Sequence, residues 1–364
     1  MRRRDFLRLG TATLATPFLY RPQLVKAGRE PLKIDISSYL LDRTAPLFDG
    51  RVQIEGTDAT FHQDAIGDMN TAAFSGNGTR EVTEIGLHPF ILACANDGFR
   101  DYALLPIPLL RQFRHKSIFI HVDAGIRTPS DLKGRRVGTP GYSSTSLTWI
   151  RGLLEDEYDV RPADMTWVIS NKDSSAKEVG KISAQERVRP RNVTVEDGPP
   201  GLDESELLLQ RNVDALIHAG TPTAFIQGDP RVVRLFPDTR LVEQDYYRRT
   251  GIYPIMHVLA IRRDTAAQVP WLARAVFKAY STAKQLAYRE KDRLSWATDM
   301  LPWYSAELEA TRALMGRNFY PYGMEANRQT FEKLFWYSHH QGLAKRVLTV
   351  DEIFLEGTLE FADG

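Results

Sequence analysis

The chain has 364 residues, of which 43% are hydrophobic and 26% are charged, as in an ordinary globular protein. Its 47 Lys and Arg nearly balance 46 Asp and Glu, and no basic tail or stripe is present, which argues against nucleic acid as a partner. Because single cores rarely grow beyond about 250–300 residues, we expect two lobes. The one cysteine, Cys94, allows no internal disulfide and lies in an apolar run, which predicts a small buried side chain.

The N-terminus has the pattern of an export signal. Arg2–Arg4 precede an apolar run, Leu9–Tyr20, and Val25–Ala27 offers small residues for cleavage. The run contains Pro17 and supplies about half of the ~20 apolar residues that a membrane span needs, so a permanent anchor is disfavoured. Twin-arginine signals are addresses that a receptor reads. We therefore expect a signal peptide over residues 1–27 and export to the periplasm by the twin-arginine route; a basic N-terminus of a cytoplasmic protein is the alternative.

Beyond this segment, strand-like runs alternate with helical ones, which predicts an α/β fold. Strands are expected over residues 33–40 and 51–61, and two further β-rich runs are Lys116–Val122 and Tyr253–Arg263. A chain that leaves one α/β unit, builds a second and returns forms two lobes joined by two crossing hinge strands, with a ligand cleft between them. We expect lobe 1 to comprise residues 28–116 and 258–364, and lobe 2 residues 117–257.

Within the expected second lobe, the pattern predicts a strand around Arg136–Gly138, a Gly/Pro loop, and a helix in which Leu147, Ile150 and Leu154 recur at helical spacing. The charged, turn-rich stretch 171–201 is expected to be an exposed excursion. Two amphipathic helices are expected near the C-terminus, over residues 271–290 and 327–342.

The start of the helix in the second lobe can bind an anion. In the loop "GTPGYSSTS", helix N-terminal amides and the hydroxyls of Ser143, Ser144 and Thr145 present donors to a carboxylate. Tyr142 could stack against a flat ligand. An ordinary capped helix start has the same local sequence, and that alternative stays open.

Arginines next to the expected cleft are further candidates, because their planar fork matches a carboxylate. Arg114 and His115 come immediately before the first crossing strand, and Arg43, followed by Thr44, comes soon after the first strand. A surface ion pair is the more common fate of any arginine.

Three titratable residues could face a ligand from the first lobe. Glu84 and His88 in "EVTEIGLHPF" could supply an acceptor or a proton donor. His257 lies inside the second crossing strand, where it could contact a ligand or be a hydrogen-bonded core histidine.

Six stretches together resemble the 4,5-dihydroxyphthalate decarboxylase family: "DRTAPLFDGRVQIEG", "FRHKSIFI", "DLKGRRVGTPGY", "WIRGLLEDEY", "RRTGIYPIMHVLAIRRD" and "YPYGMEANRQTFEKLFWYSHHQGL". They run in order along nearly the whole mature chain. The resemblance implies the type 2 periplasmic-binding-protein fold, which serves a decarboxylase as well as solute receptors. Leu41 stands where the family often has tyrosine and His88 where serine is usual, so we expect a difference in the part of the pocket that sets ligand identity.

Two functions follow from this interpretation. The first is the receptor of an ABC importer, which captures a small organic anion, expected to be an aromatic carboxylate, and delivers it to a permease in the inner membrane. The second is an enzyme that removes a carboxylate from a dihydroxylated aromatic ring without a cofactor. The export signal favours the receptor, because aromatic-acid breakdown is normally intracellular; a receptor-like sensor is not separable from it by sequence.

Motifs of metal and nucleotide sites are missing from the sequence, including HExxH, CxxC and GxxxxGK[ST]. We therefore expect no metal and no cofactor. We also expect a monomer.

Overall fold

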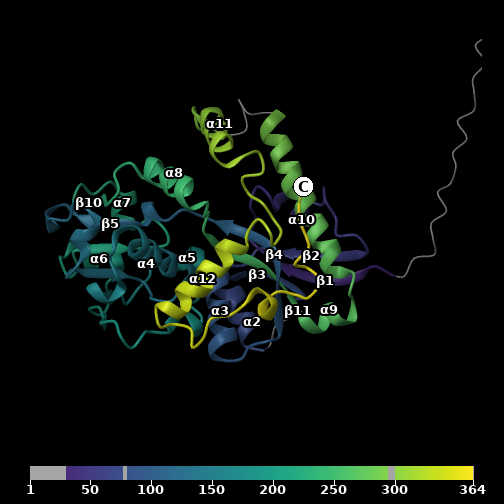
Figure 1. The fold of residues 1–364 in the computed structure, drawn as a ribbon, viewed down its shortest axis with the longest axis horizontal. Coiled ribbons are helices and arrows are strands. Elements are labelled where there is room, and N and C mark those ends of the chain that lie inside the picture. Colours follow the sequence, from purple (N-terminus) through teal and green to yellow (C-terminus); the bar gives the residue numbers. More distant parts are fainter. Residues whose placement is uncertain (1–29, 77–79, 294–299, 364) are drawn as a thin grey trace, which may run out of the picture. The chain divides into compact units, whose positions relative to one another are not determined.

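The computed structural model describes residues 30–76, 80–293 and 300–363, and the signal peptide predicted over residues 1–27 lies outside them. Two sheets organise the chain from Leu32 onward (Figure 1). The first, sheet A, has the strand order β2-β1-β3-β11-β4. Its strands are β1 (Leu32–Ser37), β2 (Thr57–His62), β3 (Val82–Gly86), β4 (Tyr102–Arg111) and β11 (Ile255–Arg262).

The second sheet, sheet B, has the order β10-β5-β9-β6-β7-β8. Its strands are β5 (Ile118–His121), β6 (Arg136–Thr139), β7 (Thr166–Ile169), β8 (Val195–Asp197), β9 (Ala215–Ile217) and β10 (Val232–Arg234). Strand β6 runs parallel to β7 and β9, whereas β5 runs antiparallel to β9 and β10. The carboxyl ends of β6, β7 and β9 therefore meet at one edge of sheet B.

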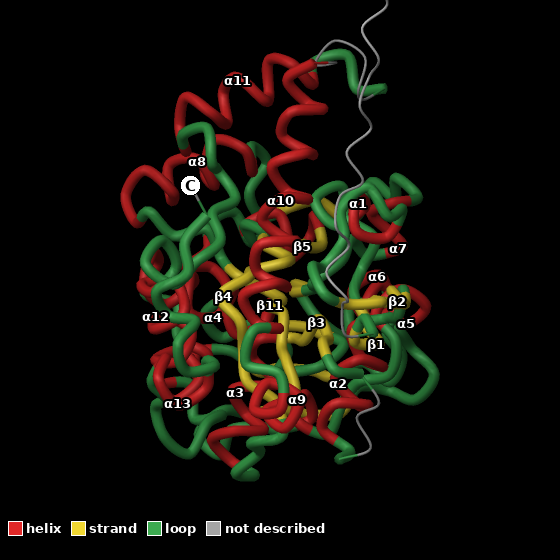
Figure 2. Tube along the Cα trace, turned by 90° about the vertical axis from the view of Figure 1, so that its right-hand side faces the viewer, coloured by secondary structure: helices red, strands yellow, loops and turns green. Residues whose placement is uncertain are grey.

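The chain leaves sheet A after β4 and returns to it in β11, which inserts antiparallel between β3 and β4 (Figure 2). The connections are residues 112–117 and residues 235–254, the second of which contains α8 (Thr239–Thr250). The result is the expected two-lobed α/β fold. The lobe boundaries at 116/117 and 257/258 stay a prediction.

Helices cover both faces of sheet A, and others, such as α6 and α7, pack against sheet B. The longer ones are α2 (Ile66–Phe74), α3 (Leu87–Asn96), α4 (Thr145–Tyr158), α10 (Leu272–Arg293), α11 (Tyr304–Met315) and α12 (Arg328–His340). The shorter ones are α1 (Ala45–Phe48), α5 (Ala176–Val179), α6 (Glu204–Leu209), α7 (Thr223–Ile226), α9 (Arg263–Gln268) and α13 (Val350–Ile353). Within the described ranges, no helix combines the length and apolar character that a membrane crossing requires.

Two apolar cores hold helices against sheet A. On one face, Leu105, Ile107 and Leu259 pack with Val276 and Tyr280 of α10. On the other face, β11 packs with residues of α3, α4 and α12. Burial of these alternating side chains is the main stabilising contribution, at roughly 25 cal/mol per Å² of apolar surface.

Helix α4 joins this second core at close range. A Cβ atom on Gly152 would lie 2.4 Å from the ring of Tyr337 on α12, so only glycine allows the approach. The predicted helix start is confirmed: Ser144 is the N-cap, and its hydroxyl accepts a hydrogen bond from the Leu147 amide at 3.4 Å. Cys94 on α3 is buried as expected, and burial raises the pKa of its thiol to about 12.

The prediction that residues 171–201 form an exposed excursion is wrong in part. The stretch contains β8, the edge strand of sheet B, and its middle packs against α2, where a Cβ atom on Gly67 would lie 2.2 Å from the carbonyl oxygen of Lys181. Ser183 is only 3% exposed. The turn-forming residues of this stretch had suggested exposure to solvent, but contacts with α2 bury its middle part.

Candidate functional site

A polar cluster lies at one end of sheet A, where β3 and β4 end and β11 begins. Along β4, the apolar residues 105, 107 and 109 face α10, and Arg111 continues their alternation. Along β3, Glu84 follows Val82 on that face, and His257 of β11 precedes Leu259. We name these residues, with the aromatic walls beside them, the hinge cluster: Glu84, Arg111, Tyr253, His257 and Tyr320.

Glu84 and His257 form a pair within this cluster. His257 Nδ1 lies 2.7 Å from Oε1 of Glu84, which is fully buried, whereas the His257 side chain keeps 12% of its surface exposed. Glu84 also accepts hydrogen bonds from the Ser38 hydroxyl at 2.7 Å and the Tyr39 amide at 2.9 Å. Burial raises the pKa of Glu84, but the hydrogen bond and charge of His257 and these donors outweigh it, so the net shift is downward. Glu84 is therefore an ionised carboxylate that holds the imidazole.

Arg111 is the basic member of the hinge cluster. Its side chain is buried, and in the described part of the chain its Nε and Nη2 have no hydrogen-bond partner. No ion pair joins it to an acid among the described residues, and Cζ lies 5.6 Å from the ring centres of both Tyr253 and Tyr320. Burial lowers its pKa, yet an arginine remains charged in any protein environment. The result is a buried cation with free donors between two aromatic walls.

Arg43 and Thr44 border the hinge cluster. The Arg43 guanidinium lies over the Tyr320 ring at 4.4 Å, and its Nε donates to the carbonyl oxygen of Leu109 at 2.8 Å. Its Nη1 pairs with Asp42 at 3.0 Å, so most of its donors are already engaged. The Thr44 hydroxyl bonds within its own turn, where it donates to Tyr39 and accepts from Leu41.

Arg114 and His115 occupy different environments although they are adjacent. Arg114 donates from Nη1 to the carbonyl oxygen of Ala219 at 2.7 Å, while its buried Nε has no partner in the described structure. His115 lies edge-on to the rings of Phe236 and Tyr246, and neither of its ring nitrogens finds a partner there. Burial lowers the pKa of Arg114 to about 10 and that of His115 to about 4. Arg114 thus reaches toward lobe 2, whereas His115 packs as a neutral ring.

The structure gathers the remaining predicted residues at the start of α4. His88 Nδ1 lies 2.6 Å from the carbonyl oxygen of Ser143, and the His88 amide donates to the Thr145 hydroxyl at 3.0 Å. Burial lowers the pKa of His88 to about 3, so its ring is neutral. Tyr142 is buried under Arg151, whose Cζ lies 3.9 Å from the ring centre. His88, Ser143 and Thr145 are linked by these hydrogen bonds, whereas the buried Tyr142 hydroxyl has no partner among the described residues. Ligand contact by His88, Tyr142, Ser143, Ser144 and Thr145 stays a prediction.

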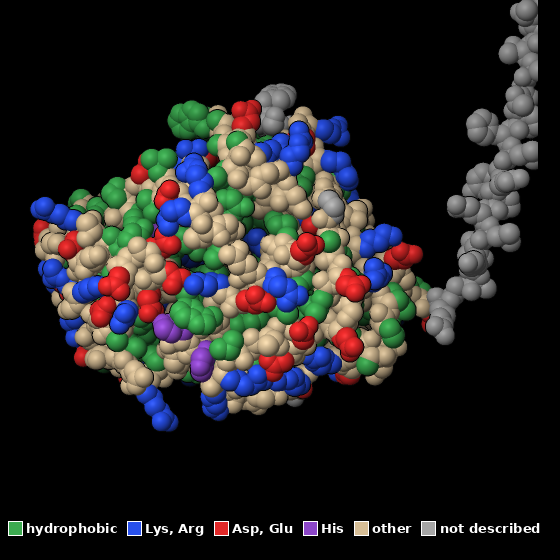
Figure 3. Space-filling view, in the orientation of Figure 1, with side chains coloured by type: hydrophobic (Ala, Val, Ile, Leu, Met, Phe, Trp, Pro, Cys, Tyr) green, Lys and Arg blue, Asp and Glu red, His purple; other side chains and the backbone are tan. Residues whose placement is uncertain are grey.

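Charges of both signs are mixed on the face that Figure 3 shows, and the net charge of the chain is small. Figure 3 shows Lys and Arg side chains interspersed with Asp and Glu over the face in view, in keeping with the net charge of +1. Selectivity for a charged ligand must therefore come from local groups such as Arg111.

Comparison with known proteins identifies the family. The chain is 33% identical over 329 residues to the 4,5-dihydroxyphthalate decarboxylase of Comamonas testosteroni, which covers 90% of this chain and 97% of that protein. It is also 33% identical over 217 residues to the protein of the same name from Pseudomonas putida, covering 60% of this chain and 81% of that one. The chain belongs to the 4,5-dihydroxyphthalate decarboxylase family. A model described as NMT1/THI5 like matches residues 102–186.

Solved structures agree with this family's fold. The periplasmic aliphatic sulphonate binding protein SsuA of Escherichia coli aligns with a TM-score of 0.51 and 16% identity, covering 91% of this chain and 99% of that one. A sulfonate-binding SsuA of Methylobacillus flagellatus aligns with a TM-score of 0.55 and 12% identity, covering 91% and 93%. At these identities the likeness shows the fold alone, and that fold is the predicted periplasmic-binding-protein fold.

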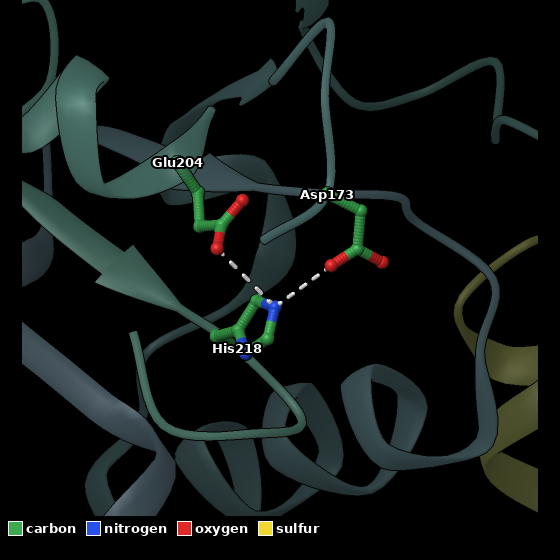
Figure 4. Close-up of side chains that lie close together, drawn as sticks. All are labelled: Asp173, Glu204 and His218. Atoms are coloured by element: carbon green, nitrogen blue, oxygen red, sulfur yellow. Dashed lines mark hydrogen bonds and ion pairs between the residues drawn. The ribbon is translucent and has the colours of Figure 1, made fainter. Parts of the chain in front are cut away.

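Sequence reasoning missed four titratable residues of this family member that the fold places near the ends of strands in the two sheets. Arg111 closes the alternating run "ALLPIPLLR", so its position at the end of a buried strand was a usable signal. The other three are Asp173, Glu204 and His218 at the edge of sheet B (Figure 4). They are far apart in sequence, and only His218, directly after the apolar strand β9, carried a local signal.

Proposed function

We propose that this protein binds a small aromatic carboxylate at the hinge cluster. The observation that carries the proposal is Arg111, a buried guanidinium with free donors and no acidic partner in the described structure. Leaving such a cation unpaired is costly, and a ligand carboxylate would remove that cost through a bidentate contact. Tyr253 and Tyr320, which lie edge to face with each other, would offer aromatic contact to a flat ring beside the guanidinium.

We further propose that the protein serves as the periplasmic receptor of an ABC importer. The fold it shares with SsuA and the arginine-rich N-terminal pattern support this role. The receptor would close over its ligand by hinge motion between the lobes and deliver it to a permease.

The export step has its own test. Replacing Arg3 and Arg4 with lysine should leave the precursor in the cytoplasm, because the export receptor reads the arginine pair rather than charge alone. Processed protein that still reaches the periplasmic fraction would contradict the twin-arginine route.

Decarboxylation is a second candidate function, favoured by the family and by the Glu84–His257 pair. In this reaction the bond between the ring carbon and the leaving carboxylate breaks, carbon dioxide departs, and the electron pair stays on the ring carbon. That carbon then takes a proton, which His257 could donate from Nε2 while Glu84 holds Nδ1 and stabilises the charged ring.

One experiment separates these candidates. The purified protein is titrated calorimetrically with phthalate and with 4,5-dihydroxyphthalate, and carbon dioxide release is followed in the same samples. The receptor role predicts binding with no carbon dioxide above the buffer control. Multiple turnovers that disappear in His257→Asn would establish the enzyme instead. If neither phthalate nor 4,5-dihydroxyphthalate binds, both candidate functions are overturned.

A further inference from the structure

One segment of the lobe of sheet B rests on helices of the other lobe. This segment, residues 176–188, which we name the strap, contains α5 and lies between β7 and β8 in the chain. It contacts α2 and α3, whose residues Ala73, Leu87 and Phe90 pack in a core of sheet A. The strap therefore joins the two lobes through contacts other than the hinge connections.

Two glycines set how closely the strap approaches α2. A Cβ atom on Gly67 would overlap the carbonyl oxygen of Lys181 and would lie 2.8 Å from that of Val179. On the strap itself, Gly180 has a φ of 76°, a backbone conformation that favours glycine, and a Cβ atom there would lie 2.9 Å from Cβ of Ala65. Strap backbone thus packs directly on helix backbone, where no flexible side chain can adjust to an added group.

Hydrogen bonds at the edge of this contact are exposed. The Lys181 amide donates to Oδ1 of Asp68 on α2 at 3.4 Å, and Nε2 of Gln185 donates to Oδ2 of Asp97, just beyond α3, at 3.1 Å. Exposed hydrogen bonds contribute little individually, because water competes for the same donors and acceptors. The close approach at Gly67 is therefore the contact whose loss should release the strap.

The strap also brings a carboxyl group close to the hinge cluster. Glu186 accepts hydrogen bonds from the Ser183 amide at 3.1 Å and the Ser183 hydroxyl at 2.9 Å. Burial raises the pKa of Glu186, and the opposing effects of Ser183, Asn70 and His257 do not cancel it. Asn70 on α2 accepts a hydrogen bond from the amide of Gly86, which lies opposite His257 in sheet A. The strap therefore reaches the end of β3 and the beginning of β11.

We propose that the strap holds the two lobes together beside the hinge cluster and must lift from Gly67 before they can separate. The connections at residues 112–117 and 235–254 then bend, and the lobes open on the side where Glu186 lies. This role follows from contacts within the chain and requires no particular ligand.

Gly67→Ala is the direct test. Alanine is a better helix former than glycine, so α2 should stay intact while the added methyl group displaces the strap. Hydrogen exchange of peptides spanning residues 176–188 should become at least about fivefold faster than in wild type. Solution X-ray scattering should show a larger radius of gyration. Ala72→Ser, at an exposed position of the same helix, is the control and should change neither quantity.

A second variant should act in the opposite direction. Glu186→Gln keeps an oxygen that accepts from Ser183 and removes a charge whose burial is unfavourable, so the strap should exchange about twofold more slowly at pH 7. This variant provides the test if Gly67→Ala does not fold. Wild-type exchange and scattering in Gly67→Ala, or equal or faster exchange in Glu186→Gln, would overturn the inference. Because no ligand is used, either result leaves the proposed function to its own experiment.

Discussion

The hinge cluster and the group formed by Asp173, Glu204 and His218 bury opposite chemistry at the ends of the two sheets. In the first, the guanidinium of Arg111 has aromatic neighbours, and no acid in the described part of the chain pairs with it. In the second, two carboxylates surround one imidazole whose nitrogens are both engaged. Because a buried charge is costly unless it is compensated, we expect the unpaired Arg111 to favour an anionic partner and the carboxylate groups to favour hydrogen-bond donors.

The comparison also separates two kinds of buried carboxylate. Glu84 is surrounded by donors that lower its pKa, whereas burial dominates at Glu204 and raises its pKa despite His218 and Ser174. Glu84 therefore stabilises the fold as an anion, and Glu204 is better accommodated with a proton.

Removing Glu84 should have the largest effect on stability. Glu84→Ala leaves His257 and the Ser38 and Tyr39 donors without their buried acceptor, so the free energy of unfolding should fall by about 3–5 kcal/mol. Urea denaturation at neutral pH measures this loss. A decrease of less than about 1 kcal/mol would mean that the pair is not formed in solution.

Glu84→Gln and Glu204→Gln should change the free energy of unfolding at pH 7 in different directions, because the pKa of Glu84 is lowered and that of Glu204 is raised. A carboxyl whose folded pKa is lowered stabilises the protein above its unfolded pKa of about 4.3 and loses that contribution as the pH falls further. Glu84→Gln should thus destabilise the protein at pH 7 and weaken the acid-dependent loss below about pH 4.3.

Glu204 has a raised pKa, so its favourable contribution exists below its unfolded pKa and is lost as the pH rises through the folded value. Glu204→Gln should therefore be as stable as wild type or more stable at pH 7. Denaturation curves of both variants at pH 4 and pH 7 test the contrast, and equal losses at pH 7 would contradict the distinction between the two carboxylates.

The start of α4 should show a smaller, structural effect. Ser144→Ala removes the N-cap and should cost about 1 kcal/mol of unfolding free energy. Thermal denaturation gives the loss, and titration with phthalate shows whether this helix start also takes part in binding. A tenfold weaker phthalate affinity of Ser144→Ala would show that the start of α4 also belongs to the binding site.

Local patterns predicted much of the fold but only part of the candidate site. Alternating apolar residues gave the strands that became β1, β5 and β11, and helical spacing gave α4, α10 and α12, because these patterns follow directly from burial on one face. Glu84 and His257 could be found from the sequence for the same reason, because each is a polar residue within an otherwise apolar buried strand.

The residues that were missed depend on long-range assembly. An arginine at the end of a strand usually reaches solvent, whereas Arg111 is buried beside the rings of Tyr253 and Tyr320, which come from other segments of the chain. Likewise, Asp173 and Glu204 lie in a turn-rich stretch that gives no sign of burial until sheet B brings both to His218.

The most direct test of the central claim is a pair of calorimetric titrations with phthalate, one of wild-type protein and one of Arg111→Met. If Arg111 holds the ligand carboxylate, wild type should bind and the variant should lose about 2–5 kcal/mol of binding free energy without loss of stability, since an unpaired buried charge has been removed. Arg231→Gln, at an exposed arginine already paired with Asp229, serves as the control and should bind as wild type does. Equal phthalate affinity of wild type and Arg111→Met would contradict the account.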